Sequence, residues 1–216
     1  MKRRDFQQRL CVACAGVLLP LAAPVRAGAY EDFFTAIEVD DDGHLRRLLA
    51  RGLDPNTIDP KGQHALYLAL RGGSPKSFAL LLQHPAIQVD VANAAGETPL
   101  MMAALRGLVG AMTTLIERGA QVQRDGWTPL HYAGSGPSAA AVALLLERGA
   151  SVDARAPNGN TPLMQAARYG SEDSVRLLLK NGAERTLRNR RGLDAAAYAR
   201  LDGRDSLARR LETGGI

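Results

Sequence analysis

Three short stretches of this chain are near copies of one another and recur at almost regular intervals. The clearest reads Gly-Trp-Thr-Pro-Leu-His-Tyr-Ala at residues 126–133, and related octapeptides begin at Gly96 and Gly159. A fixed internal period of this length marks a repeat architecture, in which each unit buries its apolar face against its neighbours. The chain is therefore expected to stack similar units in a row.

Five glycines mark the start of successive units and allow the period to be measured. They are Gly62, Gly96, Gly126, Gly159 and Gly192, separated by 34, 30, 33 and 33 residues. Within each interval a short helical segment is followed by a second, apolar one, expected at residues 77–83, 110–117, 139–147 and 172–180. Most second segments end at a glycine that can adopt the left-handed conformation of a helix C-terminus; these are Gly119, Gly149 and Gly182.

The Thr-Pro pair in each octapeptide explains how the first helix of a unit begins. A threonine hydroxyl can cap a helix N-terminus, and the proline that follows lies at the first helical position, where its missing N–H costs nothing. The last octapeptide, residues 192–199, replaces Thr-Pro with Asp194-Ala195. Asp194 can still act as the cap, so this unit is expected to keep the pattern, with a closing helix at residues 206–211.

The Thr-Pro-Leu-His-x-Ala core, followed by a second helix and a turn, resembles the ankyrin repeat. The resemblance covers nearly all of the chain after residue 29. It implies an all-α fold, an ankyrin-repeat solenoid of helix-turn-helix repeats with β-hairpin-like loops, over residues 30–216. About six repeats are expected, including N- and C-terminal caps. Function follows only weakly from the resemblance, because such arrays recognise very different partners.

Residues 1–29 have the pattern of a secretory signal peptide. A basic start with Lys2, Arg3 and Arg4 precedes an apolar run at residues 10–23, and residues 27–29 supply small side chains for cleavage. We expect export to a bacterial periplasm or secretion, with no membrane contact after cleavage; a retained anchor is the alternative. Arg3-Arg4 also resembles a twin-arginine motif, so the general secretory and twin-arginine routes both remain open.

Removal of this segment changes what the composition implies. The whole chain carries a formal net charge of +5, but residues 1–29 contain five Lys or Arg and one Asp, which leaves +1. Nucleic-acid binding is therefore not expected. Both cysteines, Cys11 and Cys14, are also in the segment, so the exported chain would have no disulfide, thiolate ligand or cysteine nucleophile.

The remaining residues do not predict catalysis, a metal site or a cofactor. His131 is the histidine of the repeat motif and is expected to hydrogen-bond within the scaffold. The other histidines, His44, His64 and His84, have no metal-ligand spacing. Asp40-Asp41-Asp42-Gly43 lacks the alternating ligands of a calcium loop and is interpreted as a helix-capping turn. The chain is therefore predicted not to be an enzyme.

The resemblance implies binding through the hairpin tips and the exposed positions of the first helices, which line a concave face. Trp127 is the only tryptophan, and Trp and Arg are enriched at binding hot spots. The candidate contact residues are Arg71, Glu97, Leu105, Arg106, Trp127, Asn160, Arg168, Tyr169, Arg190 and Arg191.

The segment from Gly119 to Gly126 is three residues shorter than the equivalent segments that begin at Gly149 and Gly182. The missing residues belong to the loop, so the shortening predicts a notch in the row of loop tips beside Trp127 and leaves the helices unchanged.

These observations favour a non-catalytic, monomeric interaction module of the periplasm that binds an unidentified partner protein. The alternative is an accessory or immunity partner of an exported enzyme, for example in peroxide defence. A third hypothesis rests on a cluster of C-terminal arginines, interpreted either as a solvated cap or as a docking patch for an acidic partner or surface. The cluster comprises Arg185, Arg188, Arg190, Arg191, Arg200, Arg204, Arg209 and Arg210.

Overall fold

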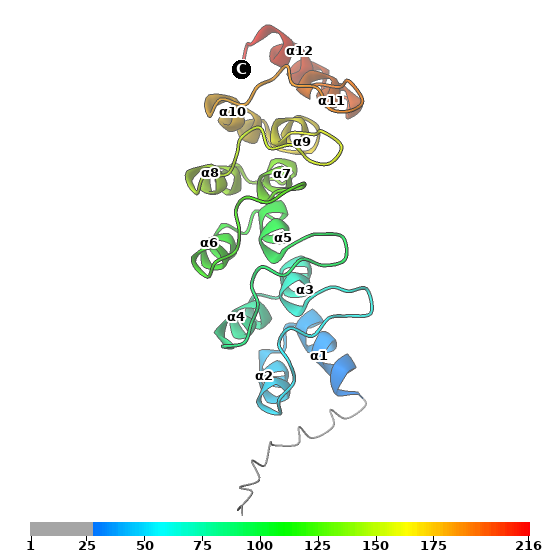
Figure 1. The fold of residues 1–216 in the computed structure, drawn as a ribbon, viewed down its shortest axis with the longest axis vertical. Helices are drawn as coiled ribbons and strands as arrows, with labels where there is room; N and C mark the ends of the chain where they lie inside the picture. Colours follow the sequence, from blue (N-terminus) through cyan, green and yellow to red (C-terminus); the bar gives the residue numbers. More distant parts are fainter. Residues whose placement is uncertain (1–27) are drawn as a thin grey trace, which may run out of the picture.

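The computed structural model describes residues 28–216, so nearly all of the predicted signal peptide lies outside the described residues. Within that range the chain forms six helix pairs that follow one another along a column (Figure 1). The pairs are α1 (Ala29–Glu38) with α2 (Asp42–Ala50), α3 (Ala65–Gly72) with α4 (Pro75–Gln83), α5 (Pro99–Leu105) with α6 (Val109–Glu117), α7 (Pro129–Ser135) with α8 (Ala139–Glu147), α9 (Pro162–Tyr169) with α10 (Glu172–Lys180), and α11 (Ala195–Leu201) with α12 (Asp205–Thr213).

In the pairs from α1 and α2 to α9 and α10, the two helices lie on opposite sides of the column. Figure 1 shows the odd-numbered helices along one side and most of the even-numbered helices along the other. Within residues 28–216 there is no β-strand, and Ile58 and His64 form an isolated bridge. The all-α solenoid is therefore confirmed, with loops that resemble hairpins without forming strands. The second helices begin within two residues of the expected positions, and α8 and α10 match them at both ends.

The helix starts follow the predicted capping chemistry. The Thr161 hydroxyl accepts a hydrogen bond from the Met164 amide at 3.3 Å, and the Thr98 hydroxyl accepts one from Met101 at the same distance. Asp194 replaces threonine as expected, because its carboxylate accepts the Ala197 amide at 2.9 Å. The degenerate last repeat therefore keeps the helix start of the others.

The core is one continuous cluster of buried side chains that runs from Phe33 in α1 to Leu211 in α12. The motif leucines Leu100, Leu130 and Leu163 are completely buried. Neighbouring repeats also meet through their backbones: a Cβ atom on Gly170 would lie 2.1 Å from the carbonyl oxygen of Gly134. The first helices α7 and α9 therefore approach too closely for a larger side chain at that position.

The loops before α3, α5, α9 and α11 share a hydrogen-bonded tip. In the loop before α5, the Asn93 amide donates to Glu97 and the Gly96 amide donates back to Asn93, both at 2.9 Å. Equivalent pairs of bonds occur at Asp59, Ala156 and Asn189. Among the described residues, the shortened loop before α7 has no such pair.

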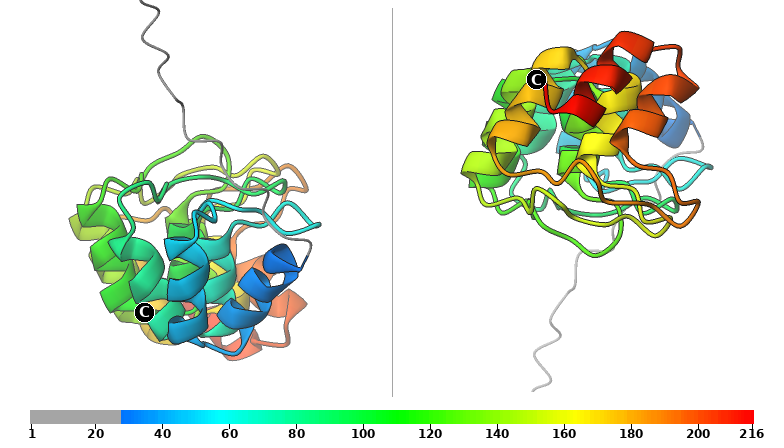
Figure 2. Two further views of the ribbon diagram at one scale, coloured as in Figure 1. Left: turned by 90° about the horizontal axis from the view of Figure 1, so that it is seen from below. Right: turned by 90° about the horizontal axis from the view of Figure 1, so that it is seen from above.

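The shortened loop also follows a different path. In Figure 1 the loops before α3, α5 and α9 project beyond the first helices, whereas the loop before α7 does not reach as far to that side. In both views of Figure 2 it arches outward from the helices instead. The adjoining helices α6 and α7 have nine and seven residues, the same as α8 and α5. The helices beside the shortened loop are thus unchanged, as expected, whereas the loop arches outward and a notch beside Trp127 stays a prediction.

Candidate partner-binding face

A carboxylate in the middle of the array is held by side chains from three successive repeats. Glu97, just before α5, accepts hydrogen bonds from the hydroxyl of Tyr67 in α3 at 2.6 Å and from the hydroxyl of Tyr132 in α7 at 3.0 Å. Asn93 donates a third bond from its side-chain amide at 3.1 Å. Glu97, a predicted contact residue, is thus also a link between repeats.

The environment fixes the protonation states of this cluster. Burial opposes the charge of Glu97, but the hydrogen bonds from Tyr67, Asn93 and Tyr132 and the nearby charge of Arg71 outweigh it and lower its pKa. Burial and the carboxylate together raise the pKa of both tyrosines. At neutral pH the cluster therefore consists of an ionised carboxylate and two neutral hydroxyl donors.

Trp127 lies next to this cluster and lines a small hollow. Its ring meets the rings of His131 and Tyr132 edge-on, with centroids 5.2 and 6.3 Å apart. The hollow has a volume of ≈ 220 Å³ and is lined by Leu105, Trp127, His131, Tyr132, Ser135 and Gln165. These residues belong to α5, α7 and α9 or directly precede α7, so three repeats contribute to one apolar depression.

His131 has the scaffold role that the motif predicted. Its Nδ1 atom accepts the Thr128 amide at 3.2 Å and lies 2.9 Å from the Thr128 hydroxyl. Its Nε2 atom is 3.0 Å from the carbonyl oxygen of Asn160 in the next repeat and donates to it. Burial lowers the pKa of the imidazole, so the ring is neutral. Both ring nitrogens are thus engaged in the fold.

The prediction that Asn160 is an exposed contact residue is wrong. Asn160 is only 3 % exposed. Its side-chain oxygen accepts hydrogen bonds from Asn189 at 2.8 Å and from the Tyr198 hydroxyl at 2.9 Å. Because its backbone carbonyl also accepts the bond from His131, Asn160 connects three repeats internally and is not available to a partner.

Arg106 is exposed, as expected, but its guanidinium has a structural role. Its Nη1 atom donates to the carbonyl oxygens of Leu70, at 3.2 Å, and of Arg71, at the C-terminus of α3. Arg204 does the same for α9, donating to Ala166, Ala167 and Gly170 at 2.9–3.1 Å. These arginines satisfy carbonyls that a helix end leaves unpaired. Sequence reasoning missed this role, because the partners lie 34–38 residues away.

Arg168 and Tyr169 extend the candidate face at the end of α9. Tyr169 is 53 % exposed, and the Arg168 guanidinium carbon lies 4.7 Å above the centre of its ring. The Arg168 Nε atom is 3.8 Å from an Asp202 carboxylate oxygen, a distance at which the ion pair is weak. Arg71 is likewise exposed at the end of α3. These three residues are placed where a partner can reach them.

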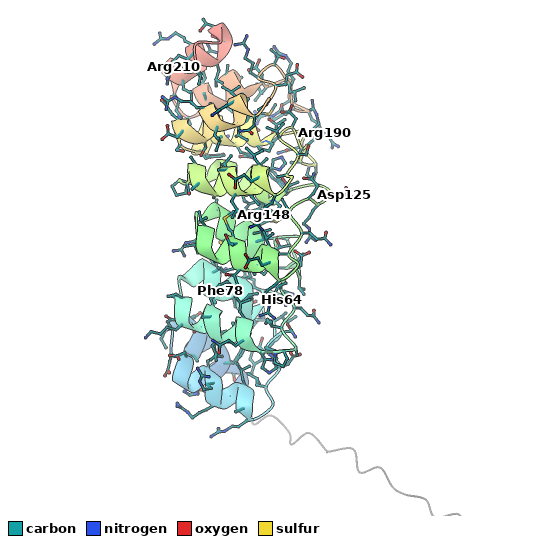
Figure 3. The ribbon with its side chains drawn as sticks, turned by 90° about the vertical axis from the view of Figure 1, so that its left-hand side faces the viewer. His64, Phe78, Asp125, Arg148, Arg190 and Arg210 are labelled. Carbon is teal, nitrogen blue, oxygen red and sulfur yellow. The ribbon has the colours of Figure 1, made fainter. Side chains whose placement is uncertain are left out.

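The C-terminal arginines separate into paired and unpaired side chains. Arg200 pairs with Glu212 at 2.7 Å, Arg210 with Glu172 at 2.6 Å, and Arg188 with Asp194 at 3.4 Å. Arg190 and Arg191 are exposed at the tip before α11. Figure 3 shows Arg190 on the edge of the column formed by the loop tips, with Asp125 on the same edge. Several arginines of the cluster are therefore bonded within the cap, and Arg190 and Arg191 at the tip are among its exposed members.

A second hollow lies between the tips of the last repeats. It has a volume of ≈ 510 Å³, and its lining includes Arg155, Arg188 and Arg190 together with Gly126 and Pro157. Arg155 donates to the carbonyl oxygen of Arg188 at 3.0 Å and so joins the two tips. Three arginine residues thus contribute to the lining of one depression beside the shortened loop.

Between residues 28 and 216, no helix has the length and apolar character needed to cross a membrane. In the same range, no group of three or more His, Cys, Asp or Glu side chains is placed to hold a metal ion.

Comparison with known proteins identifies the repeats. The family model described as "Ankyrin repeats (3 copies)" matches residues 33–125 and 121–189. The mouse B-cell lymphoma 3 protein homolog is 34% identical over 152 residues, and the human SH3 and multiple ankyrin repeat domains protein 2 is 34% identical over 170 residues. These alignments cover 67% and 76% of this chain but only 34% and 9% of the relatives, so the similarity is to part of each relative.

A solved structure is similar along most of its length. It is a chain in the complex of the Bd0816 predatory endopeptidase from Bdellovibrio bacteriovorus with immunity protein Bd3460, with a TM-score of 0.72 and 25% sequence identity. The alignment covers 85% of this chain and 97% of that chain. Together with the family match and the stacked helix pairs, these comparisons show that the chain belongs to the ankyrin-repeat family.

Proposed function

We propose that this chain is a non-catalytic, monomeric interaction module that binds a partner protein through its concave face and loop tips. The observation that carries the proposal is the hollow beside Trp127, to which α5 contributes Leu105, α7 contributes Tyr132 and α9 contributes the polar Gln165. Hollows lined by aromatic and apolar groups, with polar groups at the edge, suit the anchor side chains of protein interfaces. Exposed Tyr169 and Arg168 extend the same face at the end of α9.

The proposed site of action is a bacterial periplasm. The support is the pattern of residues 1–29, in which basic residues, an apolar run and small residues follow one another. Folding after export would need no disulfide, because both cysteines precede residue 28.

A second candidate function is that of an immunity or accessory partner of an exported enzyme. The similarity to a chain of the endopeptidase–immunity protein complex favours it, because the alignment covers almost all of that chain. An immunity partner would bind a peptidase that acts in its own compartment and block it. Mixing the purified chain with exported peptidases of its source would then reduce their activity in proportion to binding.

A site-specific photo-crosslinker tests the binding face itself. The crosslinking amino acid is placed at Tyr169 on the proposed face and, in a matched control, at Glu147, which is exposed on α8. We expect one discrete adduct at Tyr169 that competes with unmodified chain, and none at Glu147. Equal crosslinking at both positions, or a discrete adduct at Glu147 alone, would contradict the proposed face.

A further inference from the structure

The two hollows of the candidate face adjoin one another. Gly126 contributes to the lining of the hollow between the tips, and its neighbour Trp127 contributes to the apolar hollow on the first helices. A segment of a partner that crosses the chain at Gly126 and Trp127 therefore reaches both hollows. The shortened loop before α7 lacks the hydrogen-bonded tip of the other loops and follows a different path from theirs (Figures 1 and 2).

The lining of the hollow between the tips contains three arginines and no acidic residue. Arg155, Arg188 and Arg190 line it, and Asp194, which pairs with Arg188 at 3.4 Å, is the acidic neighbour that offsets one of these charges. Within residues 28–216 the Arg190 side chain has no hydrogen bond or ion pair. Desolvating such a cluster against a neutral partner would be unfavourable, whereas carboxylates would compensate it and accept its N–H donors.

The charge of the folded part favours a protein as the source of those carboxylates. Without residues 1–29 the net charge is only +1, and the first repeat contributes the acidic residues Glu31, Asp32, Glu38, Asp40, Asp41 and Asp42. A polyanion such as a nucleic acid would be repelled by that end, while a protein segment needs to match only the local charge.

From this geometry we propose that the chain recognises an acidic segment of its partner protein that carries an apolar or aromatic residue a few positions away. The acidic side chains enter the hollow lined by Arg155, Arg188 and Arg190, and the apolar side chain enters the hollow beside Trp127. This inference rests on the proposed function and adds the chemistry of the partner to it.

Selection of random 12-residue peptides displayed on phage against the full chain tests the proposal. The selected peptides are expected to combine Asp or Glu with an aromatic or large apolar residue. A synthetic peptide of the selected sequence is then titrated against four variants. Arg190→Glu and the control Arg209→Glu reverse one exposed charge each, inside and outside the hollow. Ser135→Met fills the apolar hollow, and the control Ala140→Met adds the same side chain to an exposed position of α8.

We expect Arg190→Glu to weaken binding about tenfold and Arg209→Glu to weaken it less than about twofold, with added salt reducing the difference. Ser135→Met is expected to weaken binding severalfold, whereas Ala140→Met leaves it unchanged. Selected peptides without acidic residues, with binding sensitive to Ser135→Met alone, would overturn this inference and leave the proposed function intact. Binding insensitive to both Arg190→Glu and Ser135→Met would contradict the inference and the proposed binding face together.

Discussion

His131 Nε2 donates a hydrogen bond to the carbonyl oxygen of Asn160, 3.0 Å away in the next repeat. The bond joins the start of α7 to the loop that precedes α9. Asn160 in turn accepts bonds from Asn189 and Tyr198, so this polar chain extends into the last repeat. Because repeat arrays are stabilised by nearest-neighbour interfaces, such bonds contribute directly to the cooperativity of the array.

The buried imidazole predicts a pH dependence of stability. The folded-state pKa of His131 lies below its unfolded value of about 6.5, so protons bind preferentially to the unfolded chain as the pH falls below that value. Urea unfolding is therefore expected to require less denaturant at pH 5 than at pH 7.5. A His131→Gln variant should show a smaller difference between the two pH values, and an unchanged difference would contradict a neutral, buried His131.

The bonds of Glu97 to Tyr67 and Tyr132 predict coupling between repeats. Replacing either tyrosine with phenylalanine should lower the free energy of unfolding by about 1–2 kcal/mol, because each substitution removes a hydrogen bond to a half-buried carboxylate. The double variant should deviate from additivity, since both hydroxyls contact one group. Tyr169→Phe is the control, because its hydroxyl makes no hydrogen bond within residues 28–216. Equal effects at all three tyrosines would contradict the assignment.

The sequence was sufficient to predict the fold because its determinants are local. Each of these residues acts within a few positions of its own place in the sequence. They are Thr161 with the proline that follows it, Asp194 as a substitute cap, and the glycines in the left-handed conformation, Gly119, Gly149 and Gly182. Their roles follow from the conformations that each residue type allows. The unchanged lengths of the helices beside the shortened loop before α7 also followed from counting residues between glycines.

The candidate site was less predictable because its contacts join different repeats. The position of Asn160 at a loop tip predicts exposure, but Asn189 and Tyr198 close over it. The sequence predicts a free Arg106 side chain, but the side chain reaches carbonyl groups of α3 about one repeat away. Neither role depends on neighbouring sequence, so pattern analysis had no signal for it. A contact with a partner stays a prediction for Trp127, Arg168, Tyr169, Arg190 and Arg191.

The close approach of α7 and α9 predicts a position-specific effect of alanine. Gly170→Ala should lower the free energy of unfolding by about 1–3 kcal/mol, because the added methyl group would overlap the carbonyl oxygen of Gly134. Gly110→Ala in α6 is the matched control, since a Cβ atom there meets no atom within 4 Å. Alanine at Gly110 should be neutral or stabilise by up to about 1 kcal/mol. Urea denaturation measures both, and a neutral Gly170→Ala would contradict the packing.

The proposed export predicts the behaviour of a reporter fusion. Residues 1–29 fused to alkaline phosphatase, which needs disulfides to be active, should give activity in a bacterial host, and deletion of residues 10–23 should abolish it. Replacing Arg3 and Arg4 with lysine distinguishes the two routes, because the twin-arginine route depends on that pair. Full activity of the deletion variant would contradict a role of this segment in export.

Amide hydrogen exchange of the chain with and without its crosslinked partner tests the central claim most directly. Binding through the concave face predicts added protection at residues 126–135, 168–170 and 188–191, which contain part of the lining of each hollow and the exposed end of α9. Helices α4, α6 and α8 should exchange at unchanged rates. Added protection confined to those three helices, with residues 126–135 unaffected, would contradict the proposed binding face.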